Sequence, residues 1–106
     1  VGNIVLRDRK NLSKDGIINI IVAIEKETKT IASGPDIVTR GFIYVRESEE
    51  LVNQIKEISY DSIQTSIDKN IFKWSEIKNN IRNDVGSFIY SKTKRKPIIV
   101  PIIMEV

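Results

Sequence analysis

Hydrophobic side chains along this chain fall into three short β-type runs and two longer stripes of helical spacing. The run IINIIVAI, residues 17–24, is β-branched almost throughout, which predicts a strand. Its apolar residues fall on both faces, so this strand is expected to need cover on both sides. A polar turn follows, and a second run from about Thr30 predicts an antiparallel neighbour. The final run, IIVPIIMEV, residues 98–106, predicts a third strand, in which Pro101 favours an edge position or a bulge.

The two helical stripes lie between the second and third predicted strands. Ser48 is a predicted N-cap, followed by two acids where the helix dipole favours them. The apolar stripe of this helix is Leu51, Ile55, Ile58, Ile63 and Ile67. Ser75 is predicted to cap the second helix, with Trp74 as the outer half of a hydrophobic staple and Pro97 beyond its end. The apolar face of the second helix is Ile77, Ile81, Val85, Phe88 and Ile89.

These elements predict a single α+β domain over residues 1–106, in the order β-β-α-α-β. It would be a two-layer fold, a three-stranded β-sheet with two helices packed on one face. The other face of the sheet would then keep part of residues 17–24 exposed, and an exposed apolar face of this kind marks a partner surface. The candidate oligomerisation residues are Ile18, Ile20 and Val22, or the alternate set Ile17, Ile21 and Ile24. A one-residue slip exchanges the two sets, so the pattern leaves both open.

The segment SGPDIVTRGFIYVRES, residues 33–48, combines two glycines, a proline and four charges. Gly34 and Pro35 are predicted to break or bend the second strand. The tetrapeptide FIYV, residues 42–45, would continue that strand or form a short one of its own. Asp36 and Arg40 are either a carboxylate base beside an anion-binding guanidinium, or an ion pair that holds the bend. With no histidine or cysteine nearby, we prefer the structural ion pair.

The amino-acid composition removes several classes of chemistry. The chain has no cysteine and no histidine, which excludes disulfides, thiol chemistry, Ser–His and Cys–His hydrolysis and histidine-based zinc sites. We therefore expect no catalytic, metal-binding or cofactor-binding residue in this chain. No apolar run reaches the roughly 18 residues that span a membrane, and the N-terminus has no signal-peptide pattern. A cytoplasmic location is the expectation.

The net charge of +3 is unevenly distributed. Residues 47–70 carry six acids and two bases, whereas residues 71–106 carry seven bases and three acids. Four bases lie together in the motif KTKRK: Lys92, Lys94, Arg95 and Lys96. They would either bind RNA phosphates or an acidic partner, or only offset the dipole at a helix end. Further bases that could assist are Arg7, Arg9 and Lys10.

Several segments together resemble a known family. These are GNIVLRDRKNLSKDGI, SGPDIVTRGFIYVRESEEL, the tryptophan before the second helix, and SKTKRKPIIVPIIMEV. They closely resemble the C-terminal domain of bacterial ribonuclease J, and the resemblance covers essentially the whole chain. The combination of RGFIYVRES with TKRKPIIVPIIMEV at this spacing is its most specific part.

The resemblance implies a non-catalytic C-terminal accessory domain of a longer chain, whose metallo-β-lactamase/β-CASP catalytic core is absent here. The parent would be a metal-dependent, zinc-binding endo- and 5′-to-3′ exoribonuclease of RNA processing and decay. Its histidine and aspartate ligands would lie in that core. The domain would support activity and oligomerisation, as a homo- or hetero-oligomer with ribonuclease J subunits. RNA would be bound through the parent enzyme, with direct contact by residues 92–96 as the alternative, and no membrane is implied.

Overall fold

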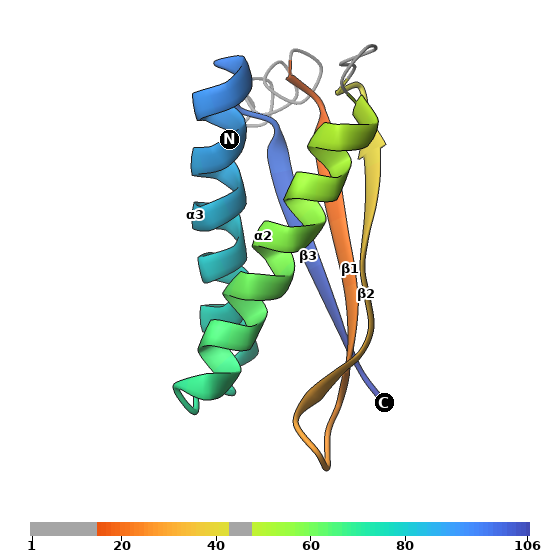
Figure 1. Ribbon diagram of the computed structural model, residues 1–106, viewed down its shortest axis with the longest axis vertical. Coiled ribbons are helices and arrows are strands. Elements are labelled where there is room, and N and C mark those ends of the chain that lie inside the picture. The colour runs from red at the N-terminus through yellow and green to blue at the C-terminus, as the bar shows by residue number, and fades with distance from the viewer. Residues whose placement is uncertain (1–14, 43–47) are drawn as a thin grey trace, which may run out of the picture.

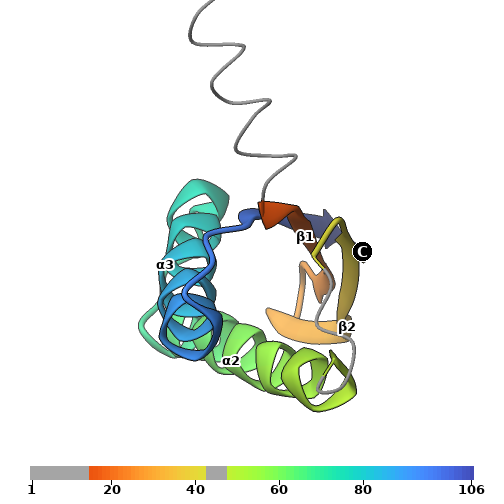
Figure 2. The ribbon, with the colours of Figure 1, turned by 90° about the horizontal axis from the view of Figure 1, so that it is seen from above.

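A computed structural model describes residues 15–42 and 48–106 of the chain. The elements are β1 (Ile17–Glu25), β2 (Thr30–Arg40), α2 (Ser48–Asp68), α3 (Trp74–Thr93) and β3 (Ile98–Glu105). The sheet order is β2-β1-β3, with β1 antiparallel to β2 and parallel to β3. Both helices lie against the same face of the sheet (Figures 1 and 2). The predicted α+β fold and its element order are confirmed.

Because β3 is parallel to β1, it starts at the end of the sheet where β2 stops, so the connection between β2 and β3 has to return to that end. The helices α2 and α3 run in opposite directions and make this return (Figure 1). Parallel neighbours cannot be joined by a tight turn, so the chain crosses over the sheet and returns beside β1. This places β3 at an edge of the sheet, as Pro101 predicts. An edge strand pairs on one side only, so it tolerates a residue that has no backbone N–H.

The central strand β1 separates its two faces sharply. Ile18, Ile20 and Val22 are 0–1% exposed and pack beneath the helices. Ile17 and Ile21 are only half-buried on the opposite face. The prediction that Ile18, Ile20 and Val22 form a partner surface is therefore wrong, because the helices already cover them. The outward set is Ile17, Asn19 and Ile21.

The predicted bend in β2 is a bulge within one continuous strand. Pairing with β1 shifts between Ile21 and Ala23 and again between Ala23 and Ile24, so β2 carries extra residues there. Gly34 lies in this region with φ at +88°, and a Cβ atom would come within 2.6 Å of the Ile21 carbonyl oxygen. Glycine is required at this position for both reasons. The bulge accompanies a break in alternation on β1, where Ile24, from the alternate set, is buried with Ala23.

The core fills the space between the sheet and the two helices. The face of α3 is confirmed, since Ile77, Ile81, Val85 and Ile89 are each fully buried and Phe88 packs against them. On α2 the predicted Leu51, Ile55 and Ile63 are buried, and Ile58 and Ile67 are partly buried. Three serines, Ser59, Ser62 and Ser66, complete the inward face of α2. A search for apolar residues alone misses them.

The start of α3 differs from the prediction. The helix begins at Trp74 with Lys73 as its N-cap residue, and no side chain caps it. The roles predicted for Ser75 as cap and Trp74 as an outer staple are wrong. Instead, Trp74 Nε1 donates a hydrogen bond to Glu105 Oε1 at 2.5 Å. This bond ties the start of α3 to the end of β3.

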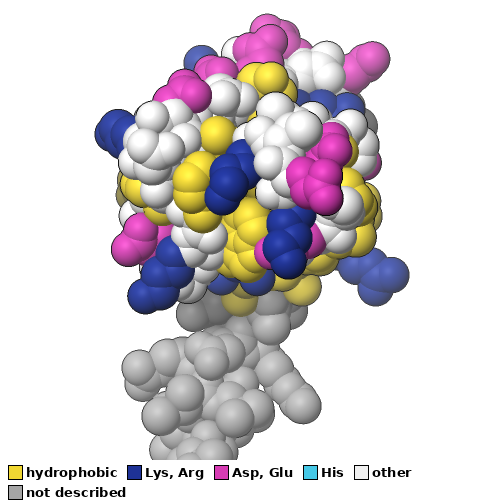
Figure 3. Space-filling model, turned by 90° about the horizontal axis from the view of Figure 1, so that it is seen from below, with side chains coloured by type: hydrophobic (Ala, Val, Ile, Leu, Met, Phe, Trp, Pro, Cys, Tyr) yellow, Lys and Arg dark blue, Asp and Glu magenta, His cyan; other side chains and the backbone are white. Residues whose placement is uncertain are grey.

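That end of the molecule also carries the β1–β2 turn. Lys29 Nζ lies 3.8 Å from the centroid of the Phe72 ring, so the turn contacts the α2–α3 connection. Seen from below, hydrophobic side chains gather at the centre of this end, between charges of both signs (Figure 3).

Two of the predictions concern a segment that is largely outside the described residues. Of FIYV only Phe42 is described; it is buried and lies beyond the end of β2. α2 begins at Ser48 as predicted, but the side chain of Ser48, and with it the capping role, lies outside the described part.

Adjacent isoleucines on β1 provide a test of the two faces. Ile20→Ala should lower the free energy of unfolding by about 2–5 kcal/mol, because it leaves a cavity under the helices. Ile21→Ala removes the same atoms from the open face and should cost only about 1 kcal/mol. Urea unfolding followed by circular dichroism measures both. Equal losses would mean that the two faces are equally covered.

Candidate functional site

The candidate sites among the described residues are two surfaces and a pocket. Within residues 15–42 and 48–106, no three His, Cys, Asp or Glu side chains are grouped as a metal site would require. No helix in this described part is long and apolar enough to cross a membrane. Three regions remain as candidates: the open face of the sheet, the basic end of α3, and a polar pocket between α2 and α3.

The open sheet face is the side of the sheet that the helices leave uncovered (Figure 2). Its apolar residues are Ile17, Ile21, Val38, Ile98, Val100, Ile102 and Met104. The strand register aligns them in rows, with Ile17 beside Ile98 and Ile21 beside Ile102. Val38 and Met104 are each 48% exposed and Ile102 is 38% exposed. The uncovered apolar face expected from the sequence is therefore present, and it carries Ile17 and Ile21 of the alternate set but not Ile24, which is buried.

Polar groups on this face lie along its middle and along β2. Asn19 pairs with Val38 in the ladder, and its Nδ2 donates to the Val38 carbonyl at 3.3 Å. Asp36 and Arg40 are both exposed on the same face. Four residues of strand separate their Cα atoms by about 13 Å, and no ion pair joins the two side chains. The predicted structural ion pair is wrong, because a spacing of four brings side chains together on a helix but not on a strand.

The basic end of α3 gathers part of the KTKRK motif around one aromatic ring. The helix ends at Thr93, and Lys94 follows in the left-handed conformation with its N–H donating to the Tyr90 carbonyl. The Nζ atoms of Lys94 and Lys96 each lie 5.2 Å from the Tyr90 ring centroid, within cation–π range. Tyr90 is itself 43% exposed. Two ammonium groups are thus held beside an accessible ring.

The other two bases of the predicted RNA-binding set, Lys92 and Arg95, lie just before and just after the end of α3. Lys92 is exposed in the last turn of α3, and Arg95 N–H donates to Thr93 Oγ1 at 3.1 Å. Asp15 contributes the nearby negative charge, since its Oδ2 accepts a hydrogen bond from the Lys96 N–H at 2.9 Å. The possible helpers Arg7, Arg9 and Lys10 lie outside the described residues.

An open groove of about 490 Å³ adjoins this basic end, between α3 and the start of β3. It is lined by Arg82, Asn83, Gly86, Ser87, Tyr90, Lys96, Pro97 and Ile99. Sequence inspection picked out Lys96 in this set but missed Arg82. The spacing of Arg82, Gly86 and Tyr90 at four-residue steps is the signal that would have placed them on one line of the helix.

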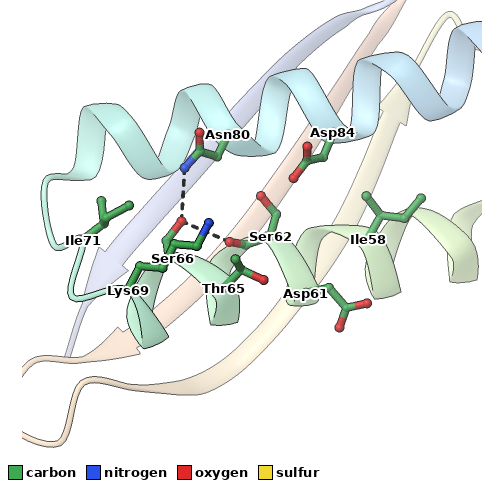
Figure 4. A pocket seen from close by; sticks show the side chains of 9 residues that line it. All are labelled: Ile58, Asp61, Ser62, Thr65, Ser66, Lys69, Ile71, Asn80 and Asp84. Carbon is green, nitrogen blue, oxygen red and sulfur yellow. Dashed lines mark hydrogen bonds between the residues drawn. The ribbon is translucent and has the colours of Figure 1, made fainter.

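The polar pocket between α2 and α3 has a volume of about 380 Å³. Asn80 Nδ2 on α3 donates to Ser66 Oγ at 3.2 Å, and Ser66 Oγ donates to the Ser62 carbonyl at 3.1 Å (Figure 4). Asp61, Asp84 and Lys69 also line the pocket. The hydroxyls of Ser59 and Ser62 are buried without a hydrogen-bond partner among the described residues. The Asn80–Ser66 hydrogen bond links the two helices. Among the lining residues, no hydroxyl is hydrogen-bonded to a carboxylate or lysine that could act as its base.

The serines on α2 allow a matched test of this hydrogen bonding. Ser59→Ala should raise the free energy of unfolding by about 1 kcal/mol, because it removes a buried hydroxyl that has no partner. Ser66→Ala should lower it by about 1 kcal/mol, because the Asn80 amide then loses its acceptor. Thermal unfolding monitored by circular dichroism reports the sign of each change. A loss of stability in Ser59→Ala would show that its hydroxyl has a favourable partner.

Comparison with known proteins adds a consistent result. Residues 4–106 match the family described as "Ribonuclease J C-terminal domain". The chain is 48% identical over 106 residues to "Ribonuclease J2" of Bacillus subtilis (strain 168), and 42% identical over 106 residues to "Ribonuclease J 2" of Staphylococcus aureus (strain NCTC 8325 / PS 47). Both alignments cover 100% of this chain but only 19% of the relative. The chain thus spans about a fifth of the length of these relatives.

Proposed function

This chain belongs to the family of ribonuclease J C-terminal domains, and we propose that it serves a longer ribonuclease as a non-catalytic accessory domain that acts by association. The parent enzyme would cleave RNA, endonucleolytically and from the 5′ end, during RNA processing and decay in the cytoplasm. Its divalent metal, zinc, would be bound in the catalytic core, outside this chain. This domain would support that activity by joining ribonuclease J subunits.

The open sheet face is the observation that carries the proposal. Its most exposed apolar side chains, Val38, Ile102 and Met104, remain 38–48% accessible to solvent. Large apolar side chains arranged contiguously on one face favour burial against a partner. Two sheets can stack face to face about 10 Å apart, with their side chains interdigitated. The proposed partner is therefore the equivalent face of another ribonuclease J subunit, of the same or a related chain.

The polar groups of the face suit pairing with such an equivalent surface. In a two-fold contact each surface meets its own copy in reverse, so residue positions contact one another reciprocally. A two-fold axis along the row of Asn19 and Val38 would place Asp36 of one copy opposite Arg40 of the other, twice. It would also place the two Asn19 amides together at the centre, where each could bond the other. The separated charges on β2 would thus find partners between subunits.

Placing a charge on the open face tests the association. Ile102→Lys in the full-length parent should weaken subunit association by at least about tenfold, because burying an unpaired ammonium in an apolar contact is costly. The melting temperature of the domain should change little, since Ile102 lies outside the core. Sedimentation velocity over a dilution series measures the change.

Tyr60→Lys is the matched control, since Tyr60 is a similarly exposed apolar residue on α2. It should leave association unchanged. If both Ile102→Lys and Val38→Lys associate as the unmodified protein does, the open face is not the subunit contact.

A second candidate function is direct RNA contact through Lys92, Lys94, Arg95 and Lys96. The gathering of two of these bases around Tyr90 favours it, because the ammonium groups are then held close together. For every RNA phosphate that the protein no longer binds, the slope of log affinity against log salt concentration should fall by about 0.7 for a single strand. Neutralising the four bases in the full-length parent and titrating RNA at two salt concentrations measures this slope. An unchanged slope would argue against direct RNA binding by these bases.

A further inference from the structure

We propose that the groove between α3 and β3 is a binding site for single-stranded RNA, in which Arg82 and Lys96 contact phosphates and Tyr90 contacts a base. The inference deepens the second candidate function and rests on it. It differs in naming a built site with an aromatic contact, instead of a general attraction between the basic cluster and phosphates.

The shape of the groove follows from the spacing along α3. Arg82, Gly86 and Tyr90 recur at four-residue steps, so they lie in one line on the helix. Pro97 and Ile99, at the start of β3, form the opposite wall. Gly86 has no side chain, so the groove extends down to Ile99 at the middle of this line. A Cβ atom on Gly86 would lie 3.5 Å from Ile99 Cδ1. The volume of about 490 Å³ is within the range of sites that hold small organic groups such as a base.

The charge of the groove favours an anion. Its lining includes two cationic residues, Arg82 and Lys96, and no acidic residue. Lys94 adds a third cation at Tyr90. The nearby Asp15 carboxylate already accepts the backbone N–H of Lys96. On Arg82, Nη1 donates to Asn79 Oδ1 at 2.7 Å, which positions the guanidinium while leaving further N–H groups for a phosphate.

The aromatic ring distinguishes a nucleic acid from other anions. A base can stack on an exposed ring while neighbouring lysines take the phosphates, a combination typical of proteins that bind single strands. The lysine side chains over Tyr90 are long and exposed, so they can turn toward a phosphate when a base arrives. A duplex keeps its bases stacked inside and would offer only its backbone. An acidic peptide would meet the cations but would gain nothing from the ring.

The chain provides matched controls for both contacts. Tyr60 on α2 is 44% exposed, almost the same as Tyr90 at 43%, and lies outside the groove. Lys56 on α2 is exposed, like Lys96, and lies outside both the groove and the basic cluster. The variants are therefore Tyr90→Ala against Tyr60→Ala, and Lys96→Ala against Lys56→Ala. Lys92→Ala, at a base of the cluster that does not line the groove, is a comparison variant. Tyr90→Phe keeps the ring and guards against a simple folding defect in Tyr90→Ala.

The experiment measures fluorescence anisotropy of a short 2′-O-methyl oligouridylate, a probe resistant to hydrolysis, with the full-length parent protein. Tyr90→Ala and Lys96→Ala should each weaken binding by at least about fivefold, the lower end of the effect expected for one stacked base. Tyr60→Ala, Lys56→Ala and Tyr90→Phe should change it less than about twofold, and Lys92→Ala should weaken it less than Lys96→Ala does. Unlabelled single strands should compete better than a duplex or polyglutamate.

Three outcomes would overturn the inference. If Lys92→Ala and Lys96→Ala weaken binding equally while Tyr90→Ala does not, the basic cluster contacts phosphates without a groove site, and the second candidate function stands. If polyglutamate competes as well as the single strand, the groove recognises acidic protein. If no variant, including neutralisation of all four bases, changes binding, the second candidate function fails as well.

Discussion

The packing of Ile18, Ile20 and Val22 beneath α2 and α3 is the contact on which the rest of the fold depends. These side chains are at the centre of the sheet, on the strand that pairs with both of the others. Fully buried isoleucines contribute more to stability than any exposed polar contact of the domain. The inward faces of the helices form the other half of the same core. The helices therefore have to lie together on this side of the sheet.

With both helices on one face, the other face of the sheet stays open. Within residues 15–42 and 48–106 no third layer covers it, and the alternation of a strand sends every second side chain there. Ile17, Ile21, Ile98 and Val100 consequently lie together on a surface rather than in a core. The same arrangement puts β3 at the sheet edge beside α3, where their junction forms the cationic groove. Two candidate surfaces thus arise from one packing arrangement, and they involve different elements of the domain.

The separation of these surfaces matters for the proposed role as an accessory domain of a larger enzyme. The open sheet face is apolar, with polar groups along its middle and along β2, which suits a protein partner. The basic end and its groove are cationic and aromatic, which suits a polyanion. Because the first is made by the face of the sheet and the second by the junction of α3 and β3, a partner subunit on the one need not exclude RNA from the other.

The periodicity of the sequence by itself determined the element types, their order and the existence of an uncovered face. Strand and helix periods are local properties, so Ile17–Ile24 and the stripe from Ile77 to Ile89 could be assigned from neighbouring residues alone. Pro101 indicated the edge strand, because the missing N–H is a property of the residue. The absence of histidine and cysteine restricted the chemistry in the same direct way. The resemblance of several segments to the ribonuclease J C-terminal domain identified the family.

The tertiary structure alone decided what depends on distant residues. It chose Ile17 and Ile21 for the open face, because only the packed helices distinguish the two sides of β1. It separated Asp36 from Arg40, because a spacing of four spans an extended strand rather than one helical turn. It turned Ser59 and Ser66 inward on α2, where Ser66 meets Asn80 of α3. It also brought Lys96 beside Arg82, since the chain must leave α3 and enter β3 before those two side chains can line one groove.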